Sequence, residues 1–356
     1  MNIGIVTQPL NGNFGGIMQN FALQCILKKM GHNPITIDFM PTIPWHLFIL
    51  TSLKSFVLLF TPKRRKFLHR KFSRPQISEQ FINRFINKTP IVHRYKTSLI
   101  HNFDLNCIIV GSDQVWRPSY NQFLEDMFLK FAKNAIIKRI AYGASFGVDK
   151  NEYTDKEIQR VKPLVDLFNA ISVREESGQS IVYNNFGKAA QIVLDPTLLL
   201  KREQYLEIIG KAQSKSIPIL GAYILDGDTH TTKLIKDTKE LLGIKTSKII
   251  TNAPEDISVE EWLCLFRDAE FIVTDSFHGT VFSIIFQKPF VTIANRERGN
   301  SRFISLLKSV NLTNRIIYEN SDNLEKIIAD KIDWNRVTES LDILRTKSID
   351  FLNAIN

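Results

Sequence analysis

The stretch TDSFHGTVFSIIFQKPF (Thr274–Phe290) places one histidine, His278, between a polar tripeptide and an apolar run. An imidazole exchanges protons near neutral pH, which suits general acid catalysis. Asp275 or Ser276 can cap a following helix, and the helix start then offers N–H groups to an anionic ligand. We therefore expect His278 to be a general acid, with Ser276 and Gly279 binding its substrate. The alternative is a structural histidine in a capped turn.

Arginines follow two other predicted strands. Arg174, in ISVRE, is expected to point into the same cleft and act with His278, unless it forms a surface ion pair with Glu175 or Glu176. The segment NRERGNSRF supplies three more arginines: Arg296, Arg298 and Arg302. Guanidinium groups bind phosphate and carboxylate in a bidentate way, so this cluster suits a small polyanion. A solvated basic face is the alternative.

Near the N-terminus, GNFGGIMQN resembles a loop that cradles a phosphate group. Its spacing is neither GxGxxG nor a Walker motif, so a nucleotide site does not follow from it. We expect Gly15 and Gly16 to allow close approach of a ligand. Gln19 and Asn20 are candidates for holding an acceptor molecule.

A second polar group occurs in GSDQVWRP, which follows an apolar strand. Asp113 and Gln114 should therefore lie at the edge of a cleft and bind substrate. Trp116 would be available to stack on a sugar ring. The alternative is a capped turn that carries Trp116 into the core.

Metal and disulfide signatures are missing from the sequence. The seven histidines are scattered, and no HxE, HExxH or CxxC arrangement occurs. Cys25, Cys107 and Cys264 lie far apart in apolar surroundings, as reduced core cysteines do. The start, MNIGIVTQPL, lacks the basic region and apolar core of a secretory signal. These features favour a cytoplasmic protein without a metal or other cofactor.

The elements that position these residues follow from short apolar runs alternating with helical patterns, the signature of βαβ units and parallel sheets. Two such series occur, so we expect an α/β fold of two Rossmann-like doubly wound domains facing a cleft, residues 1–198 and 199–356. The second includes the terminal helices. A helix is expected from about Ile17 to Met30. Predicted strands include Ile3–Val6, Cys107–Asp113, Arg139–Ser145, Ile192–Pro196, Ile217–Leu225, Thr246–Thr251, Phe271–Asp275 and Pro289–Ala294.

One segment, residues 41–75, departs from this pattern. Of the net charge of +10, eight charges fall between Asp38 and Glu79, where no acidic residue occurs, which leaves the remainder at about +2 (10 minus 8). Its apolar run is too short and too interrupted to span a bilayer. An apolar helix followed by basic residues suits an anionic membrane surface. Packing on its own domain is the alternative, and the local charge argues against a general nucleic-acid surface.

Several of these segments occur in the order typical of one family. GNFGGIMQNFALQ, GSDQVWRP, AYGASFG, ISVRE, VLDPTLL, TDSFHGTVFSI and KPFV with NRERGNSRF span roughly Met1 to Leu307. Each is weak alone, whereas the ordered set is specific. On these segments the chain resembles the polysaccharide pyruvyl transferase family.

The resemblance implies a two-domain, GT-B-like enzyme that transfers a pyruvyl group from phosphoenolpyruvate to a sugar as a cyclic ketal. It implies that His278 is the essential histidine, Arg174 the strand-end arginine, and Arg296 or Arg298 a donor-binding residue. Phe14-Gly15-Gly16 departs from the commoner aromatic-Gly-Ala form. A lipid-linked acceptor at the inner face of the cytoplasmic membrane would explain the basic segment.

Two other functions compete with this one. A glycosyltransferase of the same architecture would use a nucleotide sugar in place of phosphoenolpyruvate. A non-catalytic membrane-associated scaffold would tolerate loss of His278. The acceptor sugar, its hydroxyl positions and the stereochemistry of the ketal do not follow from the sequence.

Overall fold

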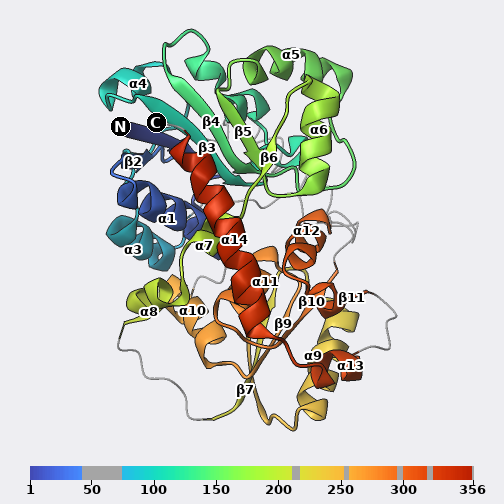
Figure 1. Cartoon of the computed structure of the whole chain (residues 1–356). Helices are drawn as coiled ribbons and strands as arrows, with labels where there is room; N and C mark the ends of the chain where they lie inside the picture. Colours follow the sequence, from blue (N-terminus) through green and yellow to red (C-terminus); the bar gives the residue numbers. More distant parts are fainter. Residues whose placement is uncertain (42–73, 211–216, 252–255, 295–299, 319–323, 355–356) are drawn as a thin grey trace, which may run out of the picture.

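The computed structural model of the chain describes residues 1–41, 74–210, 217–251, 256–294, 300–318 and 324–354. Two α/β domains lie one above the other, and helices cover their sheets (Figure 1). The first sheet draws its strands from the N-terminal half of the chain and the second from the C-terminal half. The predicted α/β class with two doubly wound domains is confirmed.

The first sheet has six parallel strands in the order β2-β1-β3-β4-β5-β6. Parallel strands buried on both faces read as continuous apolar runs, as CIIV in β3 does. The strands are β1 (Asn2–Val6), β2 (Asn33–Thr36), β3 (Cys107–Asp113), β4 (Lys138–Ala144), β5 (Ala170–Val173) and β6 (Gln191–Ile192). The helical elements of this half are α1 (Phe14–Lys29), α3 (Gln76–Phe85), α4 (Ser98–Asn102), η2 (Pro118–Tyr120), η3 (Leu124–Phe128), η4 (Lys130–Ala132), α5 (Asp155–Val165), α6 (Glu176–Phe186), α7 (Pro196–Leu199) and α8 (Arg202–Ile209).

The second sheet has five parallel strands in the order β11-β10-β9-β7-β8. They are β7 (Ile219–Ile224), β8 (Thr246–Thr251), β9 (Phe271–Thr274), β10 (Phe290–Ile293) and β11 (Ile316–Ile317). The helices are α9 (Thr229–Leu241), α10 (Val259–Asp268), α11 (Phe277–Ile285), α12 (Ser301–Ser309), η5 (Thr313–Arg315), α13 (Leu324–Ala329) and α14 (Trp334–Asn353). The predicted strands named above are present with shifts of at most two residues at their ends, except Ile192–Pro196, of which only Ile192 belongs to a strand, β6, because Asp195 caps α7 and Pro196 begins it.

Both sheets contain a point where the strand order reverses, and ligands of doubly wound folds bind beside such points at the carboxyl ends of the strands. In the first sheet the reversal lies between β1 and β3, and in the second between β7 and β9. The candidate residue Asp113 ends β3 and Gln114 follows it, and Ser276 and His278 follow β9. The topology therefore places candidate residues of both domains at the positions expected for a site.

The N-terminal loop was predicted too long. GNFGG was expected to be a loop with a helix from about Ile17, but α1 begins at Phe14, because the Asn13 side chain caps it by accepting from the Gly16 N–H at 3.2 Å. Gly15 and Gly16 are therefore in the first turn of a helix. Its N-terminus points toward the second domain (Figure 1).

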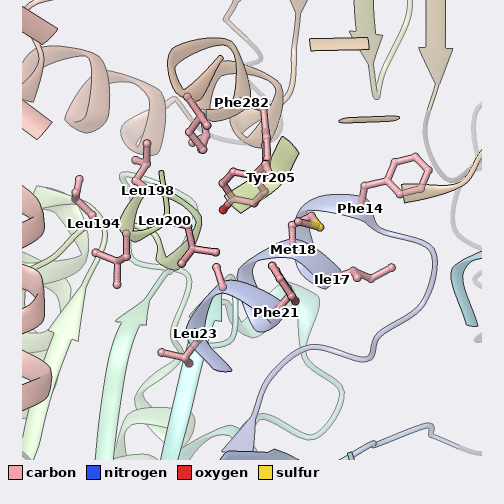
Figure 2. Close-up of a cluster of buried hydrophobic side chains, with 14 of the residues drawn as sticks. Phe14, Ile17, Met18, Phe21, Leu23, Leu194, Leu198, Leu200, Tyr205 and Phe282 are labelled. Carbon is pink, nitrogen blue, oxygen red and sulfur yellow. The ribbon is translucent and has the colours of Figure 1, made fainter. Parts of the chain in front are cut away.

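Phe14 joins the two domains. It is fully buried and stacks on Trp262 of α10, with ring centroids 5.4 Å apart, and it also contacts Tyr223 of β7. Side chains of α1 share one core with Tyr205 of α8 and Phe282 of α11 (Figure 2). A continuous apolar core thus fixes the start of α1 against the second domain.

The last helix, α14, runs along both domains (Figure 1). Near its start, the Thr338 hydroxyl oxygen accepts from Gln287 of the second domain at 3.4 Å. Near its end, the Ser348 hydroxyl accepts from the Leu194 N–H at 3.0 Å, and Phe351 packs on Tyr142 of β4. Helix α14 therefore contacts residues on both sides of the boundary expected near 198.

Most of the basic segment at 41–75 lies outside the described residues. Of its ends, Arg74 is buried, with hydrogen bonds to Asp38 at 2.5 Å and Glu79 at 3.1 Å. One of the eight basic residues is therefore neutralised within the domain. Within the described part of the chain, no helix has the length and hydropathy needed to cross a bilayer. The three cysteines are free thiols, with Cys107 buried and the other two partly buried.

Candidate active site

The turn between β9 and α11 is held by its own polar side chains. The Thr274 hydroxyl donates to the Tyr223 carbonyl at 2.6 Å and accepts from the Ser276 N–H at 3.0 Å. Ser276 caps α11, accepting from the Gly279 N–H at 3.4 Å. Asp275 instead accepts from the N–H groups that follow β7, at 2.6 and 2.7 Å, and so ties the two strands together across the reversal point.

The reason for glycine at position 279 differs from the expected one. A Cβ there would lie 2.1 Å from the Thr274 hydroxyl oxygen. Gly279 is therefore required for packing of α11 against the end of β9, whereas the sequence suggested close approach of a ligand. Ser276 likewise makes the capping contact that the sequence allowed.

The imidazole of His278 lies between the two domains. Its Nδ1 would be 2.0 Å from a Cβ at Gly15, so the ring packs directly on the first turn of α1. On the other side, Nε2 lies 3.6 Å from Asp195 Oδ2, and no described residue lies within hydrogen-bonding distance of Nε2. The ring is 6% exposed. Gly15 thus lies against the histidine, whereas the sequence predicted that it would allow close approach of a ligand.

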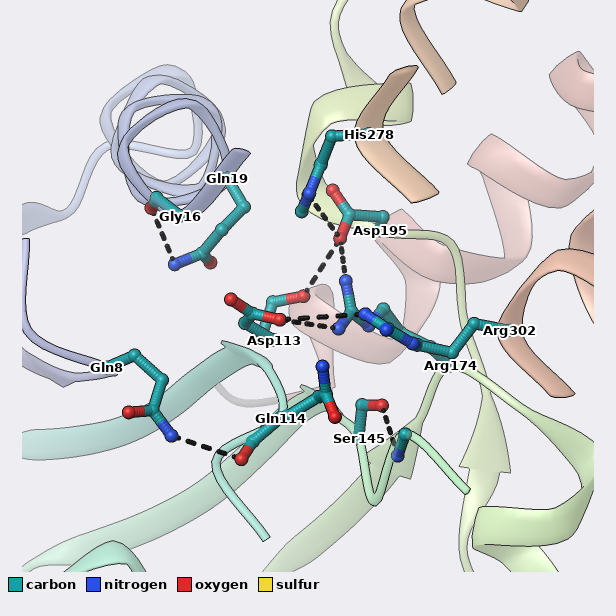
Figure 3. A network of polar contacts seen from close by, with 12 residues as sticks. Gln8, Gly16, Gln19, Asp113, Gln114, Ser145, Arg174, Asp195, His278 and Arg302 are labelled. Carbon is teal, nitrogen blue, oxygen red and sulfur yellow. Dashed lines mark hydrogen bonds and ion pairs between the residues drawn. The ribbon is translucent and has the colours of Figure 1, made fainter. Parts of the chain in front are cut away.

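Asp195 is the centre of a buried polar network (Figure 3). It follows β6 and caps α7, where Oδ1 accepts from the Thr197 N–H at 2.9 Å. Its Oδ2 accepts from the Ser112 hydroxyl at 3.2 Å and from Arg174. Burial opposes the charged carboxylate, but Arg174 and then His278 outweigh burial and hold the pKa of Asp195 below its usual range. The carboxylate is therefore charged beside the imidazole.

Arg174 joins the strands of the first domain to this network. Its guanidinium contacts Asp195 and also Asp113, whose Oδ1 lies 3.3 Å from Nη2. Burial disfavours the cation, but Asp195 and then Asp113 outweigh burial and raise the pKa of Arg174. The expected alternative, a surface ion pair with Glu175 or Glu176, is wrong, because Arg174 is 6% exposed and pairs elsewhere.

A second guanidinium, that of Arg302 on α12, reaches the same network. It is 6% exposed and its closest carboxylate oxygen is Asp113 Oδ1, at 3.8 Å from Nη1. Burial, and then Arg174, lower the pKa of Arg302 to about 10. The guanidinium carbons of Arg174 and Arg302 lie 5.0 and 5.4 Å from the centroid of the Phe277 ring. Two cations thus contact one aromatic ring, and among the described residues the Nε of each lacks a hydrogen-bond partner.

Asp113 and Gln114 both belong to the site because the strand ends abnormally. Successive side chains of a strand point to opposite faces, yet Asp113 has a φ of 71°, in the left-handed region, which breaks the alternation. Asp113 then faces the guanidinium groups, and Gln114 lies beside it (Figure 3). For Asp113, burial opposes the charge, but Arg174, then His278 and Arg302, lower its pKa.

Gln19 of α1 faces the same region (Figure 3). Its Nε2 donates to the Thr7 hydroxyl at 2.9 Å and to the Gly16 carbonyl at 3.0 Å, which fixes the orientation of the amide. The Oε1 atom is buried and has no hydrogen-bond partner among the described residues. Gln19 therefore presents an acceptor atom.

Other predicted residues lie elsewhere. Asn20 is fully buried and accepts from the Thr36 hydroxyl of β2 at 2.8 Å, so it does not join the network. Gly16 donates to the N-cap of α1. Trp116 is fully buried and donates to the Met127 carbonyl at 3.0 Å, so stacking on a sugar is excluded and the core alternative is correct. Arg296 and Arg298 lie outside the described residues.

Asp195 and Phe277 were not among the predicted site residues. The pattern IVLDP carried the only signal for Asp195, an aspartate directly after a strand and before Pro196 at the start of a helix. Phe277 lies next to His278, but its apolar side chain gave no reason to expect contact with two cations. Arg302 was part of the expected arginine cluster, and among the described residues the structure places it in the site.

The open space beside this network is small. A cavity of about 50 Å³ lies against Arg174, Asp195, Phe277 and Arg302, and its other walls come from the end of β6 and from α7, α12 and α14. This volume holds a few water molecules at most. Among the described residues, no cluster of three or more His, Cys, Asp or Glu side chains is arranged to hold a metal ion.

Solved structures share this architecture. UDP-GlcNAc 2-epimerase from Methanocaldococcus jannaschii, in complex with UDP-GlcNAc and UDP, is 14% identical, with a TM-score of 0.52 over 97% of this chain and 99% of that one. MnaA of S. aureus, bound to UDP, is 11% identical, with a TM-score of 0.54 over 96% and 90%. At such identities the likeness establishes the fold alone, and the GT-B-like prediction is confirmed.

The sequence itself matches a family. No curated protein matches the chain. The profile of the family described as polysaccharide pyruvyl transferase matches residues 13–297, which contain the start of α1, the strand ends of the first domain and the turn that carries His278. The chain therefore belongs to the polysaccharide pyruvyl transferase family.

Proposed function

We propose that this protein transfers a pyruvyl group from phosphoenolpyruvate to a sugar of a surface polysaccharide precursor and forms a cyclic ketal. One observation carries the proposal: two buried guanidinium groups and an imidazole converge at the ends of β3, β5 and β9, and one guanidinium, that of Arg302, has no carboxylate within hydrogen-bonding distance among the described residues. A buried cation without a paired carboxylate is stabilised when a bound ligand supplies the negative charge.

Phosphoenolpyruvate suits these groups because it carries a phosphate and a carboxylate. Arg174 and Arg302 would bind its oxygens, and the start of α11 would contribute N–H groups and the positive end of its dipole. Arg296 and Arg298 are proposed to contribute further positive charge. The reaction assigned here uses phosphoenolpyruvate as co-substrate and no separate cofactor.

His278 would act as the general acid. It donates a proton to the methylene carbon of phosphoenolpyruvate, and the neighbouring carbon gains oxocarbenium character. A sugar hydroxyl attacks that carbon and gives its proton to Asp113, for which a weak base suffices because the carbon is strongly electrophilic. The bond from that carbon to the phosphate oxygen then breaks, and phosphate leaves with the electron pair.

The second sugar hydroxyl closes the ketal. It attacks the oxocarbenium carbon left by phosphate departure, and its proton leaves with the phosphate. The proton held by Asp113 returns to the imidazole by way of solvent, so His278 is ready for the next turnover. The carboxylate of Asp195 lies 3.6 Å from Nε2 of that ring.

Binding requires the two domains to separate at this point. The cavity of about 50 Å³ is too small for phosphoenolpyruvate, and Gly15 and Asp195 cover both sides of the imidazole. Separation of α1 from α11 would expose the ring, and closure would exclude water from the reactive intermediate. We therefore propose that the domains open and close in each catalytic cycle.

For the acceptor, we propose a sugar on a lipid-linked precursor at the inner face of the cytoplasmic membrane. The sequence of residues 41–75, apolar and then basic, supports this part of the proposal. Sedimentation of the protein with vesicles of anionic and of neutral lipid tests it. Binding to anionic vesicles only is expected, and equal recovery with both would contradict it.

The reaction is tested by phosphate release. The enzyme is incubated with lipid-linked oligosaccharides and either phosphoenolpyruvate or a panel of nucleotide sugars, and the products are examined by mass spectrometry. We expect phosphate release with phosphoenolpyruvate and a product heavier by one pyruvyl group. Turnover with nucleotide sugars alone would establish the competing glycosyltransferase function.

A further inference from the structure

Both the backbone and the side chain of Gln114 are fixed by hydrogen bonds, although substrate binding was its only predicted role. Its backbone carbonyl accepts from Gln8 Nε2 at 3.1 Å and from Asn121 Nδ2 at 3.0 Å. Its side-chain oxygen accepts from Arg117 Nη1 at 3.1 Å. A Cβ at Gly147 would be 2.0 Å from that oxygen, so the loop after β4 also packs against the amide. Backbone and side chain are therefore both fixed.

Arg117 is fixed in turn. Its Nε lies 3.2 Å from both carboxylate oxygens of Glu152, and its Nη2 lies 2.9 Å from Oε1. The guanidinium carbon lies 4.2 Å from the centroid of the Tyr120 ring. Burial opposes the charge on Glu152, but its hydrogen bonds to Arg117 and then Ser119 lower the pKa of that carboxyl. The position of the guanidinium is thus determined by contacts outside the site.

This arrangement decides which atom of Gln114 faces the site. A guanidinium only donates hydrogen bonds, so the atom of Gln114 beside Arg117 must be the oxygen. The nitrogen then points toward Asp113 and Arg174 (Figure 3). Among the described residues, Nε2 has no hydrogen-bond partner. A ligand atom that meets it must accept a hydrogen bond.

We infer that Arg117 is a positioning residue that holds the Gln114 amide so that Nε2 donates to the attacking hydroxyl of the sugar. This inference rests on the proposed function. A sugar hydroxyl that lies beside Asp113 and Gln114 can donate its proton to Asp113 while its oxygen accepts a hydrogen bond from Gln114 Nε2. Asp113 and Gln114 together therefore orient a lone pair of that oxygen toward the carbon of phosphoenolpyruvate that gains oxocarbenium character. Attack on this carbon requires that geometry.

A double-mutant cycle tests this role. Arg117→Met, Gln114→Ala and the combined variant are compared with the wild type for kcat, for the KM of the acceptor and for the KM of phosphoenolpyruvate. Arg117→Met should lower kcat/KM for the acceptor about 10- to 100-fold, because the amide can then rotate. The KM of phosphoenolpyruvate should stay within about twofold, and the combined variant should be no worse than Gln114→Ala.

Two further variants exclude a merely structural effect. Arg117→Lys retains a donor beside the Gln114 oxygen, so it should recover most of the activity that Arg117→Met loses. Arg160→Met removes an arginine that is 59% exposed and paired with Glu125, and it should behave as the wild type does.

Three outcomes would overturn the inference. Additive losses in the combined variant would show that Arg117 acts independently of Gln114. A rise in the KM of phosphoenolpyruvate as large as the loss of kcat/KM for the acceptor in Arg117→Met would show a general loss of structure. A wild-type enzyme that releases no phosphate from phosphoenolpyruvate would overturn the proposed function as well, and this result is distinguishable because it is seen before any variant is made.

Discussion

Arg174 and Arg302 both contact the ring of Phe277, but their charges are balanced by different partners. Arg174 contacts two buried carboxylates, whereas the closest described carboxylate oxygen to Arg302 lies at 3.8 Å. Removing one partner of a buried pair leaves an uncompensated charge. Replacing Arg302 leaves no closely paired carboxylate without its cation, because the group proposed to pair with Arg302 is the substrate.

Substitution of each arginine by glutamine should therefore separate stability from function. Arg174→Gln should lower the free energy of unfolding by about 3–5 kcal/mol, since Asp195 and Asp113 lose their cation. Arg302→Gln should leave it within about 1 kcal/mol of the wild-type value, or raise it. The same variant should raise the KM of phosphoenolpyruvate at least about tenfold.

Urea unfolding and steady-state kinetics measure both quantities. Arg302→Lys is the matched control, because it keeps the positive charge and loses the bidentate geometry of the guanidinium group. Its KM for phosphoenolpyruvate should lie between the values for the wild type and Arg302→Gln. If Arg302→Gln is as destabilised as Arg174→Gln, then Arg302 is a structural cation and its proposed role in binding is wrong.

For single residues, the sequence predicted which side chains lie close together better than it predicted their contacts. His278, Arg174, Asp113 and Gln114 lie at or just past the carboxyl ends of strands in the two sheets, so an α/β pattern of two domains facing a cleft sufficed to bring them together. Asp195 was missed because its partners lie 21 and 83 residues away in the chain, and only the fold brings them near. Trp116 was equally consistent with a core or a site position, and only burial decides between them.

At the level of elements, the first turn of α1 leaves no room for a side chain at the residue that packs on the imidazole. A Cβ on Gly15 would lie 2.0 Å from His278 Nδ1, whereas a Cβ on Gly16 would have its closest neighbour at 3.6 Å, an ordinary contact. Adjacent glycines of one helix thus provide a test and its control.

Gly15→Ala should lower kcat at least about 100-fold, because the imidazole must move from its position between α1 and Asp195. Overpacking at the domain contact should also cost about 1–3 kcal/mol in the free energy of unfolding. Gly16→Ala should stay within a few-fold of wild-type kcat. Rates of phosphate release and urea unfolding of both variants measure these effects, and similar activity of the two variants would refute the proposed contact.

The elements themselves were predictable because their patterns are local. Apolar runs of β3, β8 and β9 stand between polar segments, and their bounds came within a residue of the observed ones. The start of α1 was predicted three residues late, because two glycines read as a loop when the cap at Asn13 is not considered. The interdomain role of Phe14 requires contacts with Trp262 and Tyr223, which no local pattern contains.

For the whole molecule, the buried carboxylates predict how stability depends on pH. The pKa values of Asp195 and Asp113 are lowered in the folded protein, so the stabilisation that these groups provide is complete above the unfolded value of about 4. It is lost as the pH falls below that value toward the folded pKa. The free energy of unfolding should therefore drop steeply below about pH 4.

Unfolding by urea at several pH values between about 3 and 7 measures this dependence. Asp195→Asn should be less stable than the wild type at pH 7, because Arg174 loses its carboxylate, and its stability should fall less on acidification. Parallel curves for variant and wild type would show that folding does not lower the pKa of Asp195.

The central claim is that His278, held between the two domains, gives its proton to phosphoenolpyruvate. Its most direct test is the rate of phosphate release by His278→Asn at saturating phosphoenolpyruvate and acceptor, with the unfolding temperature measured in parallel. We expect a rate at least about 100-fold below the wild type and an unfolding temperature within a few degrees of it. A folded variant that releases phosphate at close to the wild-type rate would show that His278 is not the proton donor.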